Sequence, residues 1–358
     1  MRHDPAILAA MFAGRDSRTL IANLDAQCLA LTLAGEPWAA TLSDGPTCYI
    51  CSPSVAYVDY AIEEARWLLS PPLYRGIAAF ARSCRPLVRA SGLDRQVQLN
   101  NWLFSTNPVP PITPDAAAEV RDTLIARYPD RAIVLRSLNA RSDAVTMTAL
   151  REAGFRLLPS RQIYLYDARD ALPAMTRDLR RDLKLSETTT LHWVENAGFT
   201  GRDYADCAAL YDGLYLGKYT PLNPQYSVAF IEAMHRAGVL RLRGLRDDTG
   251  RIVAFAAMFE QAGVLTDPMI GYDLTRPAKD GLYRMLTSSG IAEARARGML
   301  LNMSAGAAGF KRYRGAEAEV EYTAVYVRHL GRRHVAAVRA MELALTRIGV
   351  PLLRKYGL

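Results

Sequence analysis

The order of predicted secondary-structure elements repeats in the two halves of this 358-residue chain. In each half a strand leads into a helix, an apolar strand, a short helix and a further strand. Such a repeat indicates two structural units, and two domains are also the expectation for a chain of this length. In the second half, an antiparallel meander precedes the helix and an apolar strand, which predicts an α/β domain with a mixed sheet. The duplicated order therefore predicts two α/β domains in tandem.

The elements of the two halves can be aligned by position. In the first half we expect a strand at 97–105, a helix at 115–128, a strand at 132–138, a short helix at 143–153 and a strand at 162–166. In the second half we expect strands at 239–245, 252–260 and 264–272, a helix at 281–297, a strand at 299–303, a short helix through 310–314 and a strand at 319–327. The sequence thus predicts domains at 1–159 and 160–330, followed by a C-terminal amphipathic helix at 331–358.

Two segments of the second half carry a resemblance to a known family. They are residues 281–286 (GLYRML) and 302–311 (NMSAGAAGFK). Together with the order of elements, they resemble the tandem-GNAT (Gcn5-related N-acyltransferase) branch, which holds the CelD-type acyltransferases and the Fem peptidyltransferases. The resemblance covers 161–327 well and the first half by architecture only. It implies two GNAT-like domains of the acyl-CoA N-acyltransferase fold, transfer from a thioester or ester donor to an amine, and a V-shaped gap between central strands for the donor.

The resemblance also points to a donor-binding loop. GNAT enzymes bind the CoA pyrophosphate with a loop of the form Gln/Arg-x-x-Gly-x-Gly/Ala before a helix, whose N-terminal amides and dipole hold the anion. The matching segment reads RPAKDG at 276–281, so Arg276 and Gly281 are kept while Lys279 replaces the middle glycine. We expect these three residues to bind the donor. The alternative is an ordinary loop in which Asp280 caps the helix.

The same resemblance suggests the catalytic groups. Many GNAT enzymes have a tyrosine proton donor where this chain has Lys311, and the pair Phe310–Lys311 looks like the Phe-Lys pair of the Fem enzymes. We therefore expect Lys311 to stabilise charge during transfer, Phe310 to contact the donor and Tyr313 to be a substitute proton donor. The alternatives are a solvated lysine and a tyrosine that only packs.

Polar residues at strand ends complete the expected site. Asn302 and Ser304 close an apolar strand, where donor amides can bind because ligands favour the carboxyl ends of strands; turn formation is the alternative. A general base is expected from Glu260, Asp267 or Asp273 in the meander, since burial raises a carboxyl pKa toward neutrality. The sequence leaves the choice among the three open.

The first half is expected to be a degenerate, catalytically silent domain. Its loop at 106–114 has no glycine, and Leu150 stands at the position that matches Lys311.

The formal net charge of +8 and a pI near 9.3 favour an anionic partner. A helix over 175–185 would place four cations on one face, with Asp178 and Asp182 offsetting part of their charge; the four are Arg177, Arg180, Arg181 and Lys184. This face is either solvated or a phosphate contact. The amphipathic helix at 332–348 is expected to dock on the domain, with peripheral membrane contact as the alternative.

Other classes of protein fit less well. Five scattered cysteines do not form a disulfide framework, and we expect Cys48 and Cys51 to lie in a half-buried strand at 47–51 and not in a metal site. No apolar run approaches the roughly 20 residues of a membrane span. We therefore expect a cytoplasmic protein without a metal and without stable membrane insertion.

These observations favour an N-acyltransferase that takes an acyl group from acyl-CoA, acetyl-CoA or a carrier thioester to a small-molecule amine acceptor. The first alternative is a Fem-like transferase that uses aminoacyl-tRNA, which Lys279 and the basic helix favour. The second is a non-catalytic GNAT-fold module that binds a partner.

Overall fold

The computed structural model describes residues 3–357, apart from the side chain of Leu68. By its internal contacts the chain divides into two compact units. The first unit combines Asp4–Thr19, Asn23–Gln162 and the chain from Glu319 onward. The second unit consists of Ile163–Ala318 together with Leu20–Ala22 and His3. Both are α/β units with mixed sheets, as predicted.

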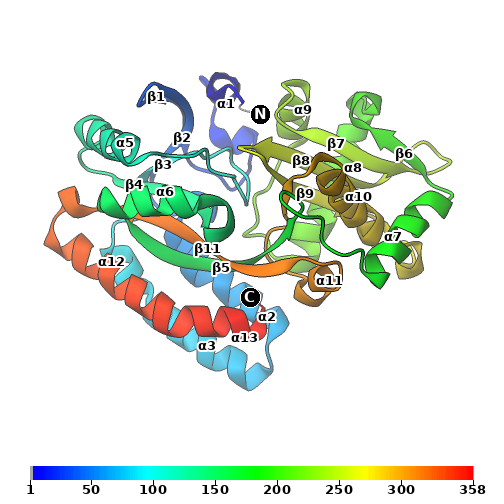
Figure 1. Cartoon of the computed structure of the whole chain (residues 1–358). Coiled ribbons are helices and arrows are strands. Elements are labelled where there is room, and N and C mark those ends of the chain that lie inside the picture. Colours follow the sequence, from blue (N-terminus) through cyan, green and yellow to red (C-terminus); the bar gives the residue numbers. More distant parts are fainter. Residues whose placement is uncertain (1–2, 358) are drawn as a thin grey trace. The chain divides into compact units, whose positions relative to one another are not determined.

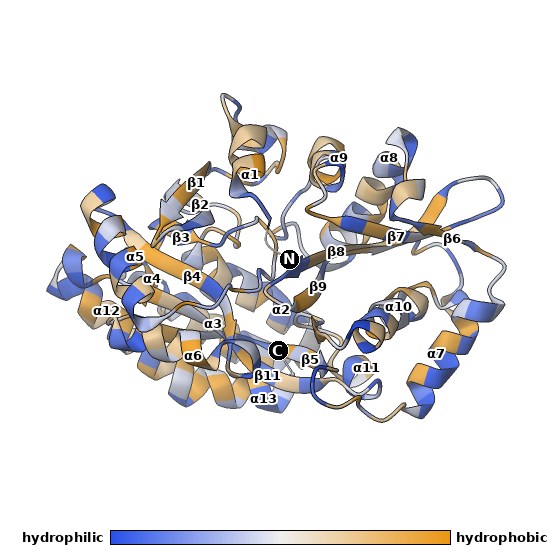
Figure 2. Cartoon of the chain, turned by 45° about the horizontal axis from the view of Figure 1, so that its top comes forward, coloured by the Kyte–Doolittle hydropathy of each residue, from blue (hydrophilic) through white to orange (hydrophobic). Residues whose placement is uncertain are grey.

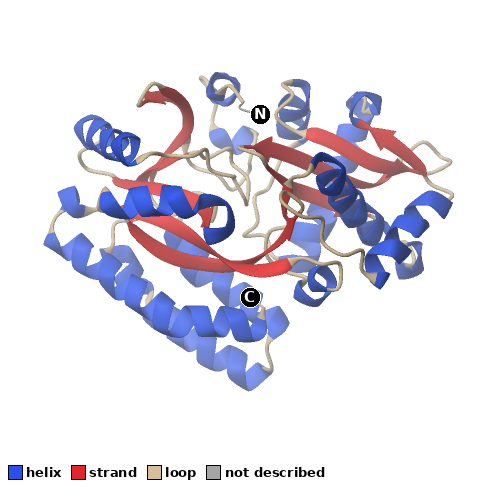
Figure 3. Ribbon diagram, viewed as in Figure 1, coloured by secondary structure: helices blue, strands red, loops and turns tan. Residues whose placement is uncertain are grey.

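The first unit has helices on both faces of its sheet (Figure 1, Figure 3). Its strands are β1 (Gln27–Leu33), β2 (Glu36–Asp44), β3 (Arg95–Leu99), β4 (Ala132–Asn139), most of β11 (Glu317–Tyr326) and the first part of β5 (Arg156–Asp167), in the order β1-β2-β3-β4-β11-β5. Its helices are α1 (Pro5–Phe12), α2 (Ala61–Leu68), α3 (Pro71–Ser83), α4 (Arg85–Ala90), α5 (Pro114–Arg127), α6 (Ala140–Glu152), α12 (Arg332–Ala344) and α13 (Val350–Tyr356). Strands β3 and β4 are parallel, and α5 connects them.

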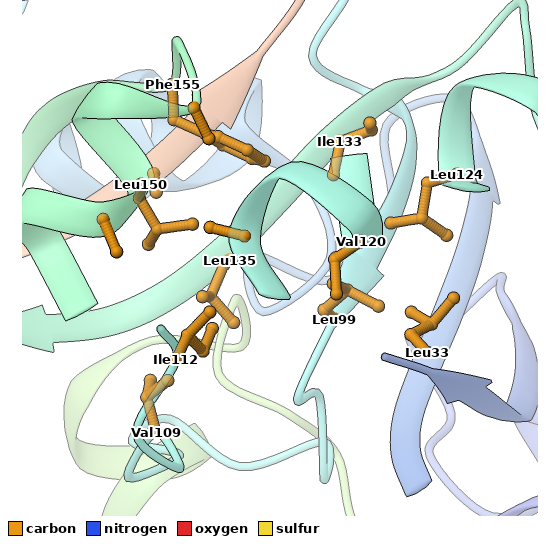
Figure 4. Packing of buried hydrophobic residues seen from close by; sticks show 14 of the residues in the cluster. Leu33, Leu99, Val109, Ile112, Val120, Leu124, Ile133, Leu135, Leu150 and Phe155 are labelled. Atoms are coloured by element: carbon orange, nitrogen blue, oxygen red, sulfur yellow. The ribbon is translucent and has the colours of Figure 1, made fainter. Parts of the chain in front are cut away.

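The alternation of side chains along β4 builds two cores in the first unit. Ile133 and Leu135 face α5 and pack with Val120 and Leu124, as Figure 4 shows. Val134 faces the other way and belongs to a second cluster with residues of α2, α3, α4 and α12. Because both faces of β4 are covered, the strand is hydrophobic along most of its length (Figure 2).

The second unit repeats this plan. Its strands are the second part of β5, then β6 (His192–Glu195), β7 (Arg241–Arg246), β8 (Ile252–Gln261), β9 (Val264–Tyr272) and β10 (Leu300–Asn302), in the order β5-β10-β9-β8-β7-β6. Its helices are α7 (Arg177–Thr188), α8 (Gly201–Tyr211), α9 (Val228–Arg236), α10 (Leu282–Arg297) and α11 (Ala308–Arg312). Strands β9 and β10 are parallel and α10 connects them, as α5 connects β3 and β4.

The two repeats exchange their last strands. β11 closes the second repeat in sequence, yet it pairs antiparallel with β4 of the first unit. β5 closes the first repeat, and its second part pairs antiparallel with β10 of the second unit. The expected boundary after residue 159 lies close to the division at Gln162, whereas the chain from Glu319 onward belongs to the first unit.

Two expected strands differ in the structure. The strand expected at 97–105 ends at Leu99, because Asn100 takes a φ of 52° and the chain turns. The half-buried strand expected at Cys48–Cys51 is a turn, so that prediction is wrong. The Cys51 thiol is buried and accepts a hydrogen bond from Asn101 Nδ2 at 3.1 Å. Burial raises the pKa of both thiols, and that of Cys48 reaches about 12.

The loop at 106–114 packs into the first unit. Asn107 is buried, donates its backbone N–H to Ser137 Oγ at 3.0 Å and accepts the N–H of Trp102 on its side-chain oxygen at 3.1 Å. Leu150 lies in the apolar core beside α5. The polar groups of Asn107 in this loop are thus hydrogen-bonded within the first unit.

Two features are absent from residues 3–357. No helix in this range is both long and apolar enough to cross a membrane. The same residues contain no group of three or more His, Cys, Asp or Glu side chains arranged to hold a metal ion.

The exchanged strand predicts that the first 162 residues do not fold alone. A fragment of residues 1–162 lacks β11, which covers the edge of β4, and lacks Val325, Val338 and Met341 of the second apolar cluster. We expect this fragment to show no cooperative transition in urea followed by circular dichroism, whereas the full chain does. A cooperative transition of the fragment would contradict the assignment of β11 and α12 to the first unit.

Candidate active site

The second unit contains a fork between two parallel strands. β9 and β10 pair at Val264–Leu300, Leu265–Leu301 and Thr266–Asn302, and β10 then ends while β9 continues to Tyr272. Beyond Asn302, β9 therefore has no ladder with β10 on that side. This is the place in the second unit that matches the gap expected between the central strands, at the carboxyl end of β10.

The strand β9 is bulged at the fork. Its register with β8 shifts between the pairs Thr266–Phe259 and Met269–Ala257, which places an extra residue in β9 at Asp267–Pro268. Pro268 has no N–H to donate to a ladder and is tolerated at such a bulge. Bulges are frequent beside active sites because they redirect a side chain, and the side chain at this one is Asp267.

Asp267 has the electrostatics of a general base. Burial raises its pKa to about 7, the charge of Glu293 adds to the rise, and Arg243, Arg241 and Lys311 oppose it. Its Oδ1 atom is buried and accepts no hydrogen bond from any described residue. Helix α10 approaches closely at Gly290, where a Cβ would lie 3.1 Å from Asp267 Oδ2. A carboxyl group that titrates near neutrality can accept a proton from an amine.

The other two carboxylates expected as bases are engaged elsewhere. Asp273 Oδ1 accepts hydrogen bonds from the backbone N–H of Thr275 at 2.9 Å and from its hydroxyl at 2.6 Å, which closes the turn after β9. Glu260 forms an ion pair with Arg297 at 2.6 Å. Of the three candidates, Asp267 is the one that lies at the fork.

The loop before α10 is short and partly exposed. Arg276 donates from Nε to Asp280 Oδ2 at 3.1 Å. This ion pair connects the two ends of the loop and stabilises its conformation. The side chain of Lys279 is exposed, on a 3-10 turn (η5, Ala278–Asp280). The expected donor residues Arg276 and Lys279 thus lie on one loop at the N-terminus of α10.

Gly281 is fixed by local geometry. Its φ is +66°, and a Cβ at this position would lie 2.4 Å from Leu185 Cδ2 of α7. The first helical hydrogen bond of α10 runs from Met285 N to Gly281 O at 3.0 Å. The amides of residues 282–284 therefore have no carbonyl partner within the helix, which is the arrangement that binds phosphate.

Lys311 is buried and holds the loop that follows β10. Its Nζ donates to the carbonyl oxygens of Met303 at 2.6 Å, Ser304 at 3.2 Å and Ala305 at 2.7 Å. The side-chain oxygen of Asn302 accepts the N–H of Ser304 at 2.9 Å, and Ser304 has a φ of 58°. Asn302 therefore takes part in a turn, which was the alternative to donor binding, and donor binding by Asn302 and Ser304 stays a prediction. The positive charge of Lys311 therefore lies next to the carbonyl groups that follow the end of β10.

Aromatic rings lie beside this lysine. The Phe310 ring contacts the Tyr283 ring of α10 at a centroid distance of 4.7 Å, and burial raises the pKa of Tyr283. The Arg314 guanidinium lies 3.4 Å from the centroid of Phe310. Tyr313 is 68% exposed. Phe310 thus packs against Tyr283 and Arg314, while the side chain of Tyr313, just after α11, is exposed.

A buried carboxylate that sequence reasoning did not select joins α7 to α10 and to the segment that follows α11. Asp182 of α7 is fully buried, so its expected role as a surface charge that offsets the basic face is wrong. Its Oδ1 accepts from Arg284 Nε of α10 at 2.6 Å, and its Oδ2 accepts from Arg314 Nε at 2.5 Å. The exposed cations of α7 are the four expected ones, Arg177, Arg180, Arg181 and Lys184.

Comparison with known proteins identifies this unit. Residues 173–312 match the sequence profile of the family described as Acetyltransferase (GNAT) domain. The chain carries a GNAT acetyltransferase domain. The matched range runs from the start of α7 to α11 and includes the fork, the loop before α10 and Asp182. The protein is accordingly a transferase, and the matched domain lies within its second unit.

Solved structures were compared as well. The C-terminal domain of a putative lysylphosphatidylglycerol synthetase from Agrobacterium fabrum is 17% identical, with 64% of this chain and 78% of that chain covered and a TM-score of 0.46. FemX is 11% identical, with 88% and 90% covered and a TM-score of 0.45. A tandem GNAT protein from the clavulanic acid biosynthesis pathway is 14% identical, with 59% and 69% covered and a TM-score of 0.34. No curated protein sequence matches the chain.

The raised pKa of Asp267 predicts how the Asp267→Asn variant changes stability with pH. The folded state holds the proton of this carboxyl up to about pH 7, whereas the unfolded chain releases it near 3.8. The wild type therefore loses stability as pH rises from about 4 to 7, whereas the asparagine side chain of the variant does not ionise. We expect the melting temperature of the variant relative to wild type to increase between pH 5 and pH 8. A difference that stays constant with pH would contradict the assignment.

Proposed function

We propose that this protein is an N-acyltransferase that binds an acyl thioester, acyl-CoA or a carrier-protein thioester, at the fork of its second unit and transfers the acyl group to a small amine. The observation that carries the proposal is the presence of three features together in the GNAT domain. These are the fork after Thr266–Asn302, the N-terminus of α10 and the carboxyl group of Asp267.

Each group has one task in the proposed reaction. The amides of 282–284 bind the donor's pyrophosphate, with Lys279 as a further cation. Asp267 removes a proton from the acceptor ammonium, so that the neutral amine attacks the thioester carbonyl. The carbon–sulfur bond then breaks, the attacking nitrogen loses a second proton, which passes to the departing sulfur, and an amide and a free thiol are formed. A base that titrates near pH 7 suits this step, because an amine acceptor is largely protonated at neutral pH.

Lys311 is a positioning residue in this proposal. Its three contacts with carbonyl oxygens fix the loop 303–305 at the end of β10, next to the donor path. Its charge also contributes to the potential at Asp267. The role expected from sequence, stabilising charge that develops during transfer, remains part of the proposal. Tyr313 is the less favourable proton donor because its ring is mostly exposed.

A second donor, aminoacyl-tRNA, is favoured by a specific feature of the same domain. Leu185 of α7 packs against Gly281, so the basic face of α7 lies on the helix that borders the donor loop. A long polyanionic donor could contact Lys279 and this face together. The CoA pyrophosphate needs only the loop and the helix N-terminus.

The double variant Arg276→Ala/Lys279→Ala tests the donor assignment. We expect its KM for the acyl donor to rise at least several-fold, with kcat at saturation largely kept, because phosphate binding is lost while the chemistry is not. Steady-state kinetics with acetyl-CoA and a panel of small amines measures both constants. The control is Arg236→Ala/Arg251→Ala, which removes two exposed cations elsewhere in the same unit.

The results of this experiment distinguish an acyl-CoA donor, an aminoacyl-tRNA donor and a non-catalytic module. An unchanged KM for acetyl-CoA in the loop variant contradicts the donor site. Normal CoA binding together with loss of charged-tRNA binding makes aminoacyl-tRNA the donor. Absence of binding to both by the wild type would favour a non-catalytic binding module.

A further inference from the structure

One layer of helices in the first unit carries the entire net charge of the chain. Residues 61–90, which form α2 to α4, hold five arginines and two glutamates. Residues 332–356, which form α12, η7 (Leu345–Gly349) and α13, hold five arginines, one lysine and one glutamate. Their combined net charge of +8 equals the formal net charge of the whole chain. All other residues together are neutral, so the basic character is local.

Helices α2, α3, α4 and α12 share one apolar cluster and thus form a layer, which η7 and α13 continue beyond α12. Ile62 of α2, Ala78 of α3, Val88 of α4 and Val338 of α12 pack together with Val134 of the sheet. In Figure 1 the helices α12 and α13 run along α3 on one side of the first unit. Because the buried sides of the helices face the sheet, their opposite sides face solvent.

The solvent side of α12 to α13 carries a stripe of arginines. Exposed residues follow one another at intervals of seven, four, four and seven along this segment: Arg332, Arg339, Leu343, Arg347 and Arg354. Such intervals keep residues on one side of a helix. Within residues 3–357 these four arginines form no ion pair. Arg75 and Arg82 add two exposed cations on α3. The positive charge is therefore available to a partner.

Large apolar side chains are exposed among these arginines. Trp67 is 62% exposed, Phe80 45%, Leu343 58% and Ile348 43%. They are four of the ten large apolar side chains that are exposed in the described part of the chain, although the layer is a small part of the sequence. A basic face with exposed Trp, Phe and Leu is typical of helices that lie at the surface of a membrane.

We propose that this helical layer, α2 to α4 with α12 and α13, binds a membrane surface that contains anionic lipid. Arginines attract lipid phosphates and nucleic-acid phosphates alike. Leu343 and Ile348, however, gain free energy from acyl chains and nothing from a phosphodiester backbone. The mixture of unpaired cations and exposed apolar groups on one layer therefore fits a lipid surface better than a nucleic acid. The proposal does not depend on the proposed function.

Vesicle flotation tests the charge. The full chain should float with vesicles of phosphatidylcholine that contain 30% phosphatidylglycerol and should not float with phosphatidylcholine alone. The variant Arg339→Gln/Arg347→Gln/Arg354→Gln should bind the anionic vesicles on the order of 100-fold more weakly, since each arginine near the surface contributes about fivefold. The matched control Arg177→Gln/Arg180→Gln/Arg181→Gln removes the same charge from α7 and should float as the wild type does. Equal loss in both variants, or equal flotation with neutral vesicles, would overturn the proposal.

Tryptophan emission tests the apolar contact. Trp38 and Trp102 are buried, so Trp67 is the most exposed tryptophan of the described residues. Its emission should shift to shorter wavelength on anionic vesicles and be quenched by brominated lipid. The Trp67→Phe variant should still float but lose the shift. If brominated lipid leaves emission unchanged, or if tRNA binding is lost in the α12–α13 variant while flotation persists, the layer does not bind lipid and the proposal fails.

Discussion

One buried carboxylate organises the GNAT domain of this protein. Asp182 lies within α7 and accepts hydrogen bonds from Arg284 of α10 and Arg314 after α11. Asp182 and Arg314 are both buried, so removing either one leaves the other as a buried charge that has lost this partner, whereas Arg284 is partly exposed. The pair with Arg284 connects α7 to the first turn of α10, next to Gly281, where the amides of 282–284 have no carbonyl partner within the helix. The geometry of the proposed donor site therefore depends on a residue that does not contact the donor.

The fork between β9 and β10 and the buried Lys311 are further fixed features of the same domain. β10 ends at Asn302, and the following loop is held from behind by the Lys311 ammonium. On the other arm of the fork, the bulge turns Asp267 toward α10, where burial raises its pKa to about 7. A carboxyl group with a raised pKa and a buried cation are thus placed beside the two strands of the fork by backbone features, a bulge and a strand end. Side chains on rigid elements of this kind keep their positions better than side chains on mobile loops.

Sequence periodicity predicted much of the fold because long amphipathic and apolar segments have strong patterns. The helices at α5, α7 and α10 and the strands β8 and β9 begin and end within a few residues of the expected positions. The sequence left open whether the strand through Tyr164 closes the first sheet or opens the second, and the pairing of β11 with the first unit could not be predicted, since strand order depends on pairing partners and not on local pattern. Cys48–Cys51 looked like a strand because buried cysteines give an apolar pattern in a turn as well. The burial of Asp182 was not predicted, although Leu179 and Leu185 lie three residues away on either side, because its two arginine partners are distant in the sequence.

Calorimetric titration of CoA into two isosteric variants of α7 tests the central claim that Asp182 holds the donor site. Asp182→Asn removes the buried anion, while the control Asp178→Asn removes a partly exposed one on the same helix. The account predicts that wild type and Asp178→Asn bind CoA alike and that Asp182→Asn binds much more weakly, with a free energy of unfolding lower by about 3–5 kcal/mol. CoA binding by Asp182→Asn with wild-type affinity, or no binding by the wild type, would contradict it.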